Sequence, residues 1–187
     1  MAARVLESAP PQFALVGLSM GGYLSFEIVR QAPQRVLKLA LLDTMARPDT
    51  ADVSAARRTQ MELAVQGRFK EVVDALVPRL LHPARHGDAQ LRAVIDAMAQ
   101  DVGVAAYVRQ QRANIGRADS NPTLARIRCP TLVLVGDADV LAPPSRAAEM
   151  VAGITGAQLV TVPQCGHLST LERPDEVTRA LLAWLQT

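Results

Sequence analysis

The chain has 187 residues, which is long enough for one domain with its own hydrophobic core. Its residues are 49% hydrophobic and 20% charged, and 20 basic residues against 18 acidic ones give a net charge of +2. Because the charges are mixed along the chain, without a basic stripe or an acidic tail, nucleic acid and a membrane surface are not expected as partners. Residues 1–9 lack an apolar leader and the longest apolar runs are strand-sized, so we expect no signal peptide, no membrane span and a cytoplasmic location.

The first 46 residues predict a helix, a strand, a second helix and a second strand. Residues 1–9 have a helical pattern, which Pro10 and Pro11 end. Apolar runs at 13–18 and 36–42 predict strands, and the second run is continuously hydrophobic, as in parallel sheets buried on both faces. The helix between them is expected to end near Gln31.

Residues 47–126 contain helical patterns and no convincing strand. Pro78 disturbs the second of four candidate helices and Gly103 separates the last two. The four helices are expected at 53–66, 69–81, 88–102 and 104–115.

The strand and helix alternation resumes after residue 126. Strands are predicted at 131–135 and 158–162, and helices at 145–152 and 175–185. Strands alternating with helices, interrupted by one helical insertion, predict a three-layer α/β domain with a parallel sheet.

The turn after the first strand reads Gly17-Leu18-Ser19-Met20-Gly21-Gly22. Such a strand–turn–helix places Ser19 at the tip in a strained conformation, and Gly17 and Gly21 are expected to let strand and helix pass closely. The amide of Met20 then lies at a helix N-terminus, which favours a developing oxyanion. A glycine-rich turn of this kind also binds phosphate, but Ser19 replaces the second glycine of Gly-x-Gly-x-x-Gly, so a nucleotide-binding module is the weaker hypothesis.

This turn resembles the nucleophile elbow of the α/β-hydrolase family, whose pattern Gly-x-Ser-Met-Gly-Gly it matches at every position. The resemblance implies a catalytic triad in the order serine, acid, histidine, which Ser19, Asp139 and His167 provide. Each follows a predicted strand, and the carboxyl ends of parallel strands meet at one edge of the sheet. Asp137 and Asp43 also follow strands and are alternative candidates for the acid.

By the same resemblance, Ser19 is the nucleophile, His167 the general base, Asp139 the residue that orients His167, and the Met20 amide an oxyanion donor. The implied activity is hydrolysis of small carboxylic esters through an acyl-enzyme, without a cofactor or a metal. Six residues are candidates for lining the acyl pocket, although ordinary packing between helices explains those in the insertion at least as well. They are Leu18, Met61, Phe69, Met98, Tyr107 and Leu168.

The resemblance also implies a domain organisation. Residues 1–46 and 127–187 would form the hydrolase core, and residues 47–126 a helical cap. The family's sheet has about eight strands with the nucleophile after the fifth, so the four strands predicted here match the last four. We therefore expect a core that lacks the N-terminal strands, with strand 13–18 as an exposed edge able to pair with a second copy of the chain. The alternative function is an inactive or partner-dependent fragment, because the loop that supplies a second oxyanion donor is not found in this sequence.

Other reactive side chains have simpler interpretations. His82 and His86 are four residues apart, but Pro83 disturbs their alignment, so loop residues are expected rather than metal ligands. Cys129 and Cys165 permit one disulfide at most, and Cys165 is expected to be a structural thiol. Arg57 is expected on a solvated helix face.

Overall fold

The computed structural model describes all 187 residues and contains every strand and long helix that the sequence predicts. The strands are β1 (Phe13–Leu18), β2 (Val36–Leu42), β3 (Thr131–Gly136) and β4 (Gln158–Val162). The longer helices are α1 (Ala2–Ser8), α2 (Met20–Gln31), α3 (Ala51–Leu63), α4 (Phe69–Leu80), α5 (Ala89–Ile115), α7 (Pro144–Gly153) and α9 (Pro174–Gln186). Two one-turn helices were not predicted, α6 (Asn121–Leu124) and α8 (Ser169–Glu172).

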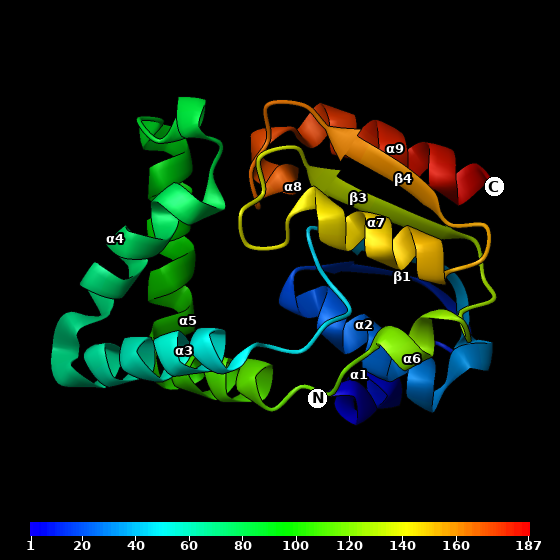
Figure 1. Cartoon of the computed structure of the whole chain (residues 1–187), viewed down its shortest axis with the longest axis horizontal. Helices are drawn as coiled ribbons and strands as arrows, with labels where there is room; N and C mark the ends of the chain where they lie inside the picture. The colour runs from blue at the N-terminus through cyan, green and yellow to red at the C-terminus, as the bar shows by residue number, and fades with distance from the viewer.

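The four strands form one parallel sheet in the order β1-β2-β3-β4, which confirms the predicted fold class. Residues 39–42 of β2 and all residues of β3 are buried, and because alternate residues point to opposite faces, both faces of the sheet are covered there. One face packs against α2 and α7 through Leu39, Leu41 and Phe26, among others. The other face packs against α9 through Leu42 and Trp184, among others, which completes a three-layer arrangement (Figure 1).

Strand β1 lies at an edge of the sheet and pairs only with β2. Val16 in this strand is 47% exposed, which is high for a residue in the middle of an apolar strand. The predicted position of this strand at an edge is therefore confirmed. None of the helices has the length and apolar character needed to cross a bilayer.

Helices α3, α4 and α5 lie together beside the sheet and its flanking helices (Figure 1). The predicted break at Gly103 is present as a kink inside α5, where this residue has φ 64° and ψ 167°. Pro78 does not end α4, which continues to Leu80. Gly67, at φ 84°, turns the chain between α3 and α4, because a residue without Cβ adopts this conformation without strain.

A buried ion-pair network ties this helical segment to the sheet domain. Asp49 is almost completely buried and accepts hydrogen bonds from Arg57 at 2.7 Å and from Arg117 at 2.6 Å. The guanidinium of Arg117 also lies over the ring of Tyr23 in α2, at 4.1 Å from its centroid. The expectation that Arg57 lies on a solvated face is wrong, because its side chain pairs with the buried carboxylate of Asp49. Helix periodicity does not indicate this pair, since Asp49 precedes the helix that carries Arg57.

Candidate active site

The turn between β1 and α2 holds Ser19 in a conformation that only a constrained site maintains. Ser19 has φ 51° and ψ −113°, and a non-glycine residue at positive φ stores strain. Residues at the end of β2 bind both the amide and the carbonyl group of Ser19. The Ser19 amide donates to the Leu42 carbonyl at 2.9 Å, and the Thr44 hydroxyl donates to the Ser19 carbonyl at 2.8 Å.

The glycines of this turn have different roles. A Cβ on Gly17 would lie 2.4 Å from the Gly21 carbonyl oxygen and 2.4 Å from the Ser25 hydroxyl oxygen, so close passage of strand and helix requires glycine there, as predicted. The Gly21 backbone takes part in this close passage, but a Cβ on Gly21 would meet no atom within 4 Å, so the passage does not require glycine at position 21. The second close approach is at Gly22, where a Cβ would meet the Thr44 side chain at 2.4 Å.

Ser19, His167 and Asp139 are linked by hydrogen bonds across three loops. His167 Nε2 lies 2.8 Å from Ser19 Oγ, and His167 Nδ1 lies 2.8 Å from Asp139 Oδ2. The histidine and the aspartate are both buried. A buried carboxylate bonded to Nδ1 fixes the imidazole tautomer that has a lone pair on Nε2, the atom that faces the serine hydroxyl.

The three candidate acids occupy different positions. Asp139 binds His167 through one oxygen, while its other oxygen accepts from the amides of Leu141 at 2.8 Å and Ala142 at 2.9 Å. Asp137 instead accepts from two amides of the turn before the histidine, Gln164 and Cys165, each at 3.0 Å. The geometry therefore favours Asp139 over Asp137 as the partner of the histidine.

Asp43 is the third candidate acid, and it is fully buried. It accepts hydrogen bonds from the Gly136 amide and the Ser169 hydroxyl rather than from His167. Burial raises the pKa of Asp43 from 3.8 to about 7, and the two hydrogen bonds oppose part of this rise. These contacts place Asp43 beside the triad without making it the histidine's partner.

The backbone around His167 is held by residues that sequence analysis did not assign to the site. The His167 amide donates to the carbonyl oxygen of Leu80, at the end of α4, at 2.9 Å. Glu172 is buried and its carboxylate accepts from the Gly166 amide at 2.7 Å and from the His82 amide at 2.8 Å. Glu172 follows the Gly-His loop by five residues in sequence, but only the tertiary structure shows that it joins this loop to α4.

Five of the six residues predicted to line an acyl pocket are divided among three hydrophobic clusters, two of which share Phe69. Met61, Phe69 and Tyr107 pack in one cluster of the helical segment, with the two rings 5.1 Å apart. Leu168 packs against a second cluster between α4 and α5, whereas Leu18 packs against the sheet face covered by α9. Met98 is 49% exposed. Packing between helices thus describes Met61, Phe69 and Tyr107 but not the exposed Met98, and a role of the predicted residues in binding substrate stays a prediction.

The other reactive side chains have structural partners. Cys129 and Cys165 are both free, and burial raises the pKa of the Cys165 thiol to about 12, so it is a poor nucleophile. The ring of His82 accepts from the Ala84 amide, and the ring of His86 lies 3.1 Å from the Leu81 carbonyl oxygen. No three His, Cys, Asp or Glu side chains are grouped so that they could hold a metal ion.

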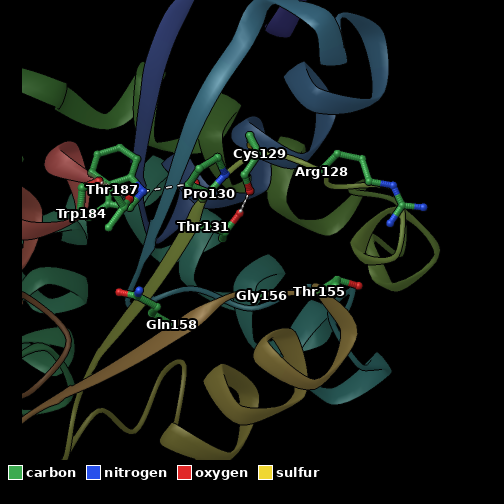
Figure 2. A pocket seen from close by; sticks show the side chains of 9 residues that line it. All are labelled: Arg128, Cys129, Pro130, Thr131, Thr155, Gly156, Gln158, Trp184 and Thr187. Carbon is green, nitrogen blue, oxygen red and sulfur yellow. Dashed lines mark hydrogen bonds between the residues drawn. The ribbon is translucent and has the colours of Figure 1, made fainter.

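A polar cavity of about 330 Å³ lies at the opposite end of the sheet, around the first residues of β3 and β4 (Figure 2). Figure 2 shows two hydrogen bonds in its wall, from Trp184 to the Pro130 carbonyl oxygen at 3.2 Å and from the Thr131 hydroxyl to the Cys129 carbonyl oxygen at 2.9 Å. No triad residue lines this cavity. It is therefore separate from the candidate active site.

Comparisons with known proteins agree with this geometry. Residues 2–180 match the alpha/beta hydrolase family. The chain is 26% identical over 184 residues to a pimeloyl-[acyl-carrier protein] methyl ester esterase of Nitrosospira multiformis, covering 94% of this chain and 69% of that protein. Among solved structures, it is similar to a thermophilic esterase from Thermogutta terrifontis, with 31% identity, a TM-score of 0.85 and coverage of 99% of this chain and 68% of that one.

A hydrolase from Pseudomonas aeruginosa is also similar, with 28% identity, a TM-score of 0.90 and coverage of 100% of this chain and 71% of that one. These matches extend over the sheet, the helical segment and the loops that carry the linked serine, histidine and aspartate. The chain belongs to the alpha/beta hydrolase family, a family of hydrolytic enzymes.

Proposed function

We propose that this chain is a serine hydrolase that cleaves small carboxylic esters through an acyl-enzyme on Ser19. The observation that carries the proposal is the unbroken chain of 2.8 Å contacts from Ser19 Oγ through His167 to Asp139. Two of the similar proteins described above are esterases, which supports an ester as the substrate class.

In the proposed reaction, Ser19 Oγ attacks the ester carbonyl carbon while His167 Nε2 takes the hydroxyl proton. The Met20 amide, at the N-terminus of α2, stabilises the oxyanion of the tetrahedral intermediate. The intermediate then expels the alcohol, which receives the proton from His167. A water molecule, deprotonated by His167, attacks the acyl-enzyme, and the acid leaves as Ser19 regains its proton. Asp139 keeps the imidazole oriented and stabilises its positive charge in both steps.

Residues 47–126, which contain α3, α4 and α5, are proposed to act as a cap beside this site. One connection to the site is direct, because the Leu80 carbonyl oxygen accepts from the His167 amide. A second runs through the Glu172 carboxylate, which accepts from the amides of His82 and Gly166. We propose that a cap held in this way limits the size of the acyl and alcohol groups that reach Ser19, in line with the proposed preference for small esters.

The test is labelling of the purified chain with a fluorophosphonate probe, in which Ser19 Oγ displaces fluoride from phosphorus. Ser19→Ala is the matched control, since it removes only the hydroxyl oxygen and its proton. Labelling of the wild type that is lost in Ser19→Ala supports the proposal, and a panel of p-nitrophenyl esters from acetate to octanoate then defines the acyl length.

Absence of labelling in a folded wild-type chain would contradict the proposal. That result would favour the alternative, a chain that depends on another polypeptide for activity. The observation behind this alternative is the open edge at β1, where Val16 is exposed. Under this alternative, Ser19 would react with the fluorophosphonate probe only after the second polypeptide is added.

A further inference from the structure

The segment Leu42-Asp43-Thr44, at the end of β2, contacts all three loops that carry the linked side chains. The Leu42 carbonyl and the Thr44 hydroxyl bind the backbone of Ser19. The Asp43 carboxylate binds the other two loops, through Gly136 and Ser169. One three-residue segment is thus bonded to the loops of nucleophile, acid and base.

Asp43 makes the connection between the acid loop and the base loop. Its Oδ1 accepts from the amide of Gly136 at 3.0 Å, three residues before Asp139. Its Oδ2 accepts from the hydroxyl of Ser169, two residues after His167, and the Ser169 side chain is completely buried. A carboxylate with one hydrogen bond to each loop restrains the separation of those loops, because movement of either loop away from Asp43 would lengthen its bond to the carboxylate.

The backbone of Asp43 supports the same interpretation. Asp43 has φ 46°, in the left-handed region, which aspartate adopts more readily than most non-glycine residues. Its own amide donates to the Leu134 carbonyl oxygen in β3 at 2.9 Å, so hydrogen bonds hold both the backbone and the side chain of this residue.

We propose that Asp43 is a positioning residue, which joins the loops of Asp139 and His167 through Gly136 and Ser169 and thereby keeps the imidazole aligned with Ser19. This inference rests on the proposed function of that triad. The hydrogen bonds of the Asp43 carboxylate go to Gly136 and Ser169 and not to the histidine ring. Its effect on the reaction passes through the two loops.

Two variants test the connection separately. Ser169→Ala removes the bond to the base loop and leaves the bond from Gly136 to Asp43. Asp43→Asn keeps the size of the side chain and tolerates positive φ, but replaces one acceptor oxygen with a donor group. Thr131→Val is the matched control, because the Thr131 hydroxyl is also buried and bonded but lies at the opposite end of the sheet (Figure 2).

The rate of fluorophosphonate labelling and the thermal midpoint are measured for each variant. We expect Ser169→Ala and Asp43→Asn to label about 10- to 100-fold more slowly than the wild type, since small displacements of a catalytic group reduce rates by this order. Thr131→Val is expected to lower the midpoint as much as Ser169→Ala does while labelling at the wild-type rate. Equal labelling rates in Ser169→Ala, Asp43→Asn and Thr131→Val would overturn the inference.

A second readout does not depend on activity. The proton between His167 and Asp139 gives a downfield proton resonance in NMR spectra, which reports the length of that bond. We expect this resonance to shift or broaden in Ser169→Ala and Asp43→Asn and to stay unchanged in Thr131→Val. If the wild type is not labelled, the proposed function fails, and the positioning role of Asp43 is then tested by this resonance alone. An unchanged signal in all variants would overturn that role.

Discussion

The backbone amide of His167 donates to the carbonyl oxygen of Leu80, so the proposed catalytic base is anchored to the last turn of α4. The same loop is joined to that helix by Glu172, whose two oxygens bind the amides of Gly166 and His82. The helical segment 51–115 is therefore part of the support of the site, and its removal would displace the histidine.

Replacing Glu172 with glutamine tests this anchoring. The amide group of glutamine would direct a donor toward a backbone donor, so one of the two buried hydrogen bonds is lost. We expect a loss of about 1–3 kcal/mol in the free energy of unfolding and a labelling rate about tenfold lower. Urea unfolding and probe labelling measure these effects. Glu7→Gln, at an exposed position in α1, should change stability by less than about 0.5 kcal/mol.

Alanine substitutions at Gly17 and Gly21 should have opposite effects on stability. At Gly17 a Cβ would overlap backbone and side-chain atoms at 2.4 Å, and we expect a loss of about 3 kcal/mol or more. At Gly21, inside α2, a Cβ meets nothing within 4 Å, so alanine should stabilise the chain by about 0.5–1 kcal/mol. Thermal unfolding of the two variants measures both effects. A stable Gly17→Ala would contradict the close passage of β1 and α2.

Asparagine at Asp139 should abolish most of the activity without unfolding the chain. The amide of asparagine no longer selects the histidine tautomer that accepts the serine proton, so labelling should slow by about 1,000-fold or more. Asp137→Asn is the matched comparison, because Asp137 binds only backbone amides. It should lower stability by about 1 kcal/mol and leave labelling within about threefold of wild type. The reverse result would make Asp137 the acid.

Asp43 should make the chain less stable as the pH rises. Its folded-state pKa of about 7 lies above the ordinary value of 3.8, so between these pH values the folded chain binds more protons than the unfolded chain. Stability from this group is therefore lost as pH rises, by up to about 1.4 kcal/mol per pH unit. The titratable groups near Asp43 are His167, Asp139 and Cys165.

The difference in unfolding free energy between wild type and Asp43→Asn, measured by urea titration from pH 5 to 8, isolates this contribution. Wild type should lose stability relative to the variant up to about pH 7 and then level off. A constant difference across this range would show that Asp43 is not protonated in the folded chain. If Asp43→Asn is more stable than the wild type at pH 7 and yet is labelled more slowly, the slower labelling cannot be due to a loss of stability.

The sequence by itself determined the parallel α/β architecture and the elbow at Ser19. Continuous apolar runs and helical periodicity are local properties of the chain, and each predicted strand was found in the structure. The order of Ser19, Asp139 and His167 after three strands was sufficient to predict their convergence, because the carboxyl ends of parallel strands share one edge.

Only the tertiary structure decided how that edge is held together. Asp43, Ser169 and Glu172 act through partners between 6 and 126 residues away, and no local pattern distinguishes a buried carboxylate that binds distant amides from an exposed one. The same reason explains the errors at Arg57, which pairs with a buried carboxylate, and at Gly21, where the structure has room for a Cβ. Periodicity reports which face of an element is apolar, whereas the choice of polar partners depends on which loops the packed sheet brings together.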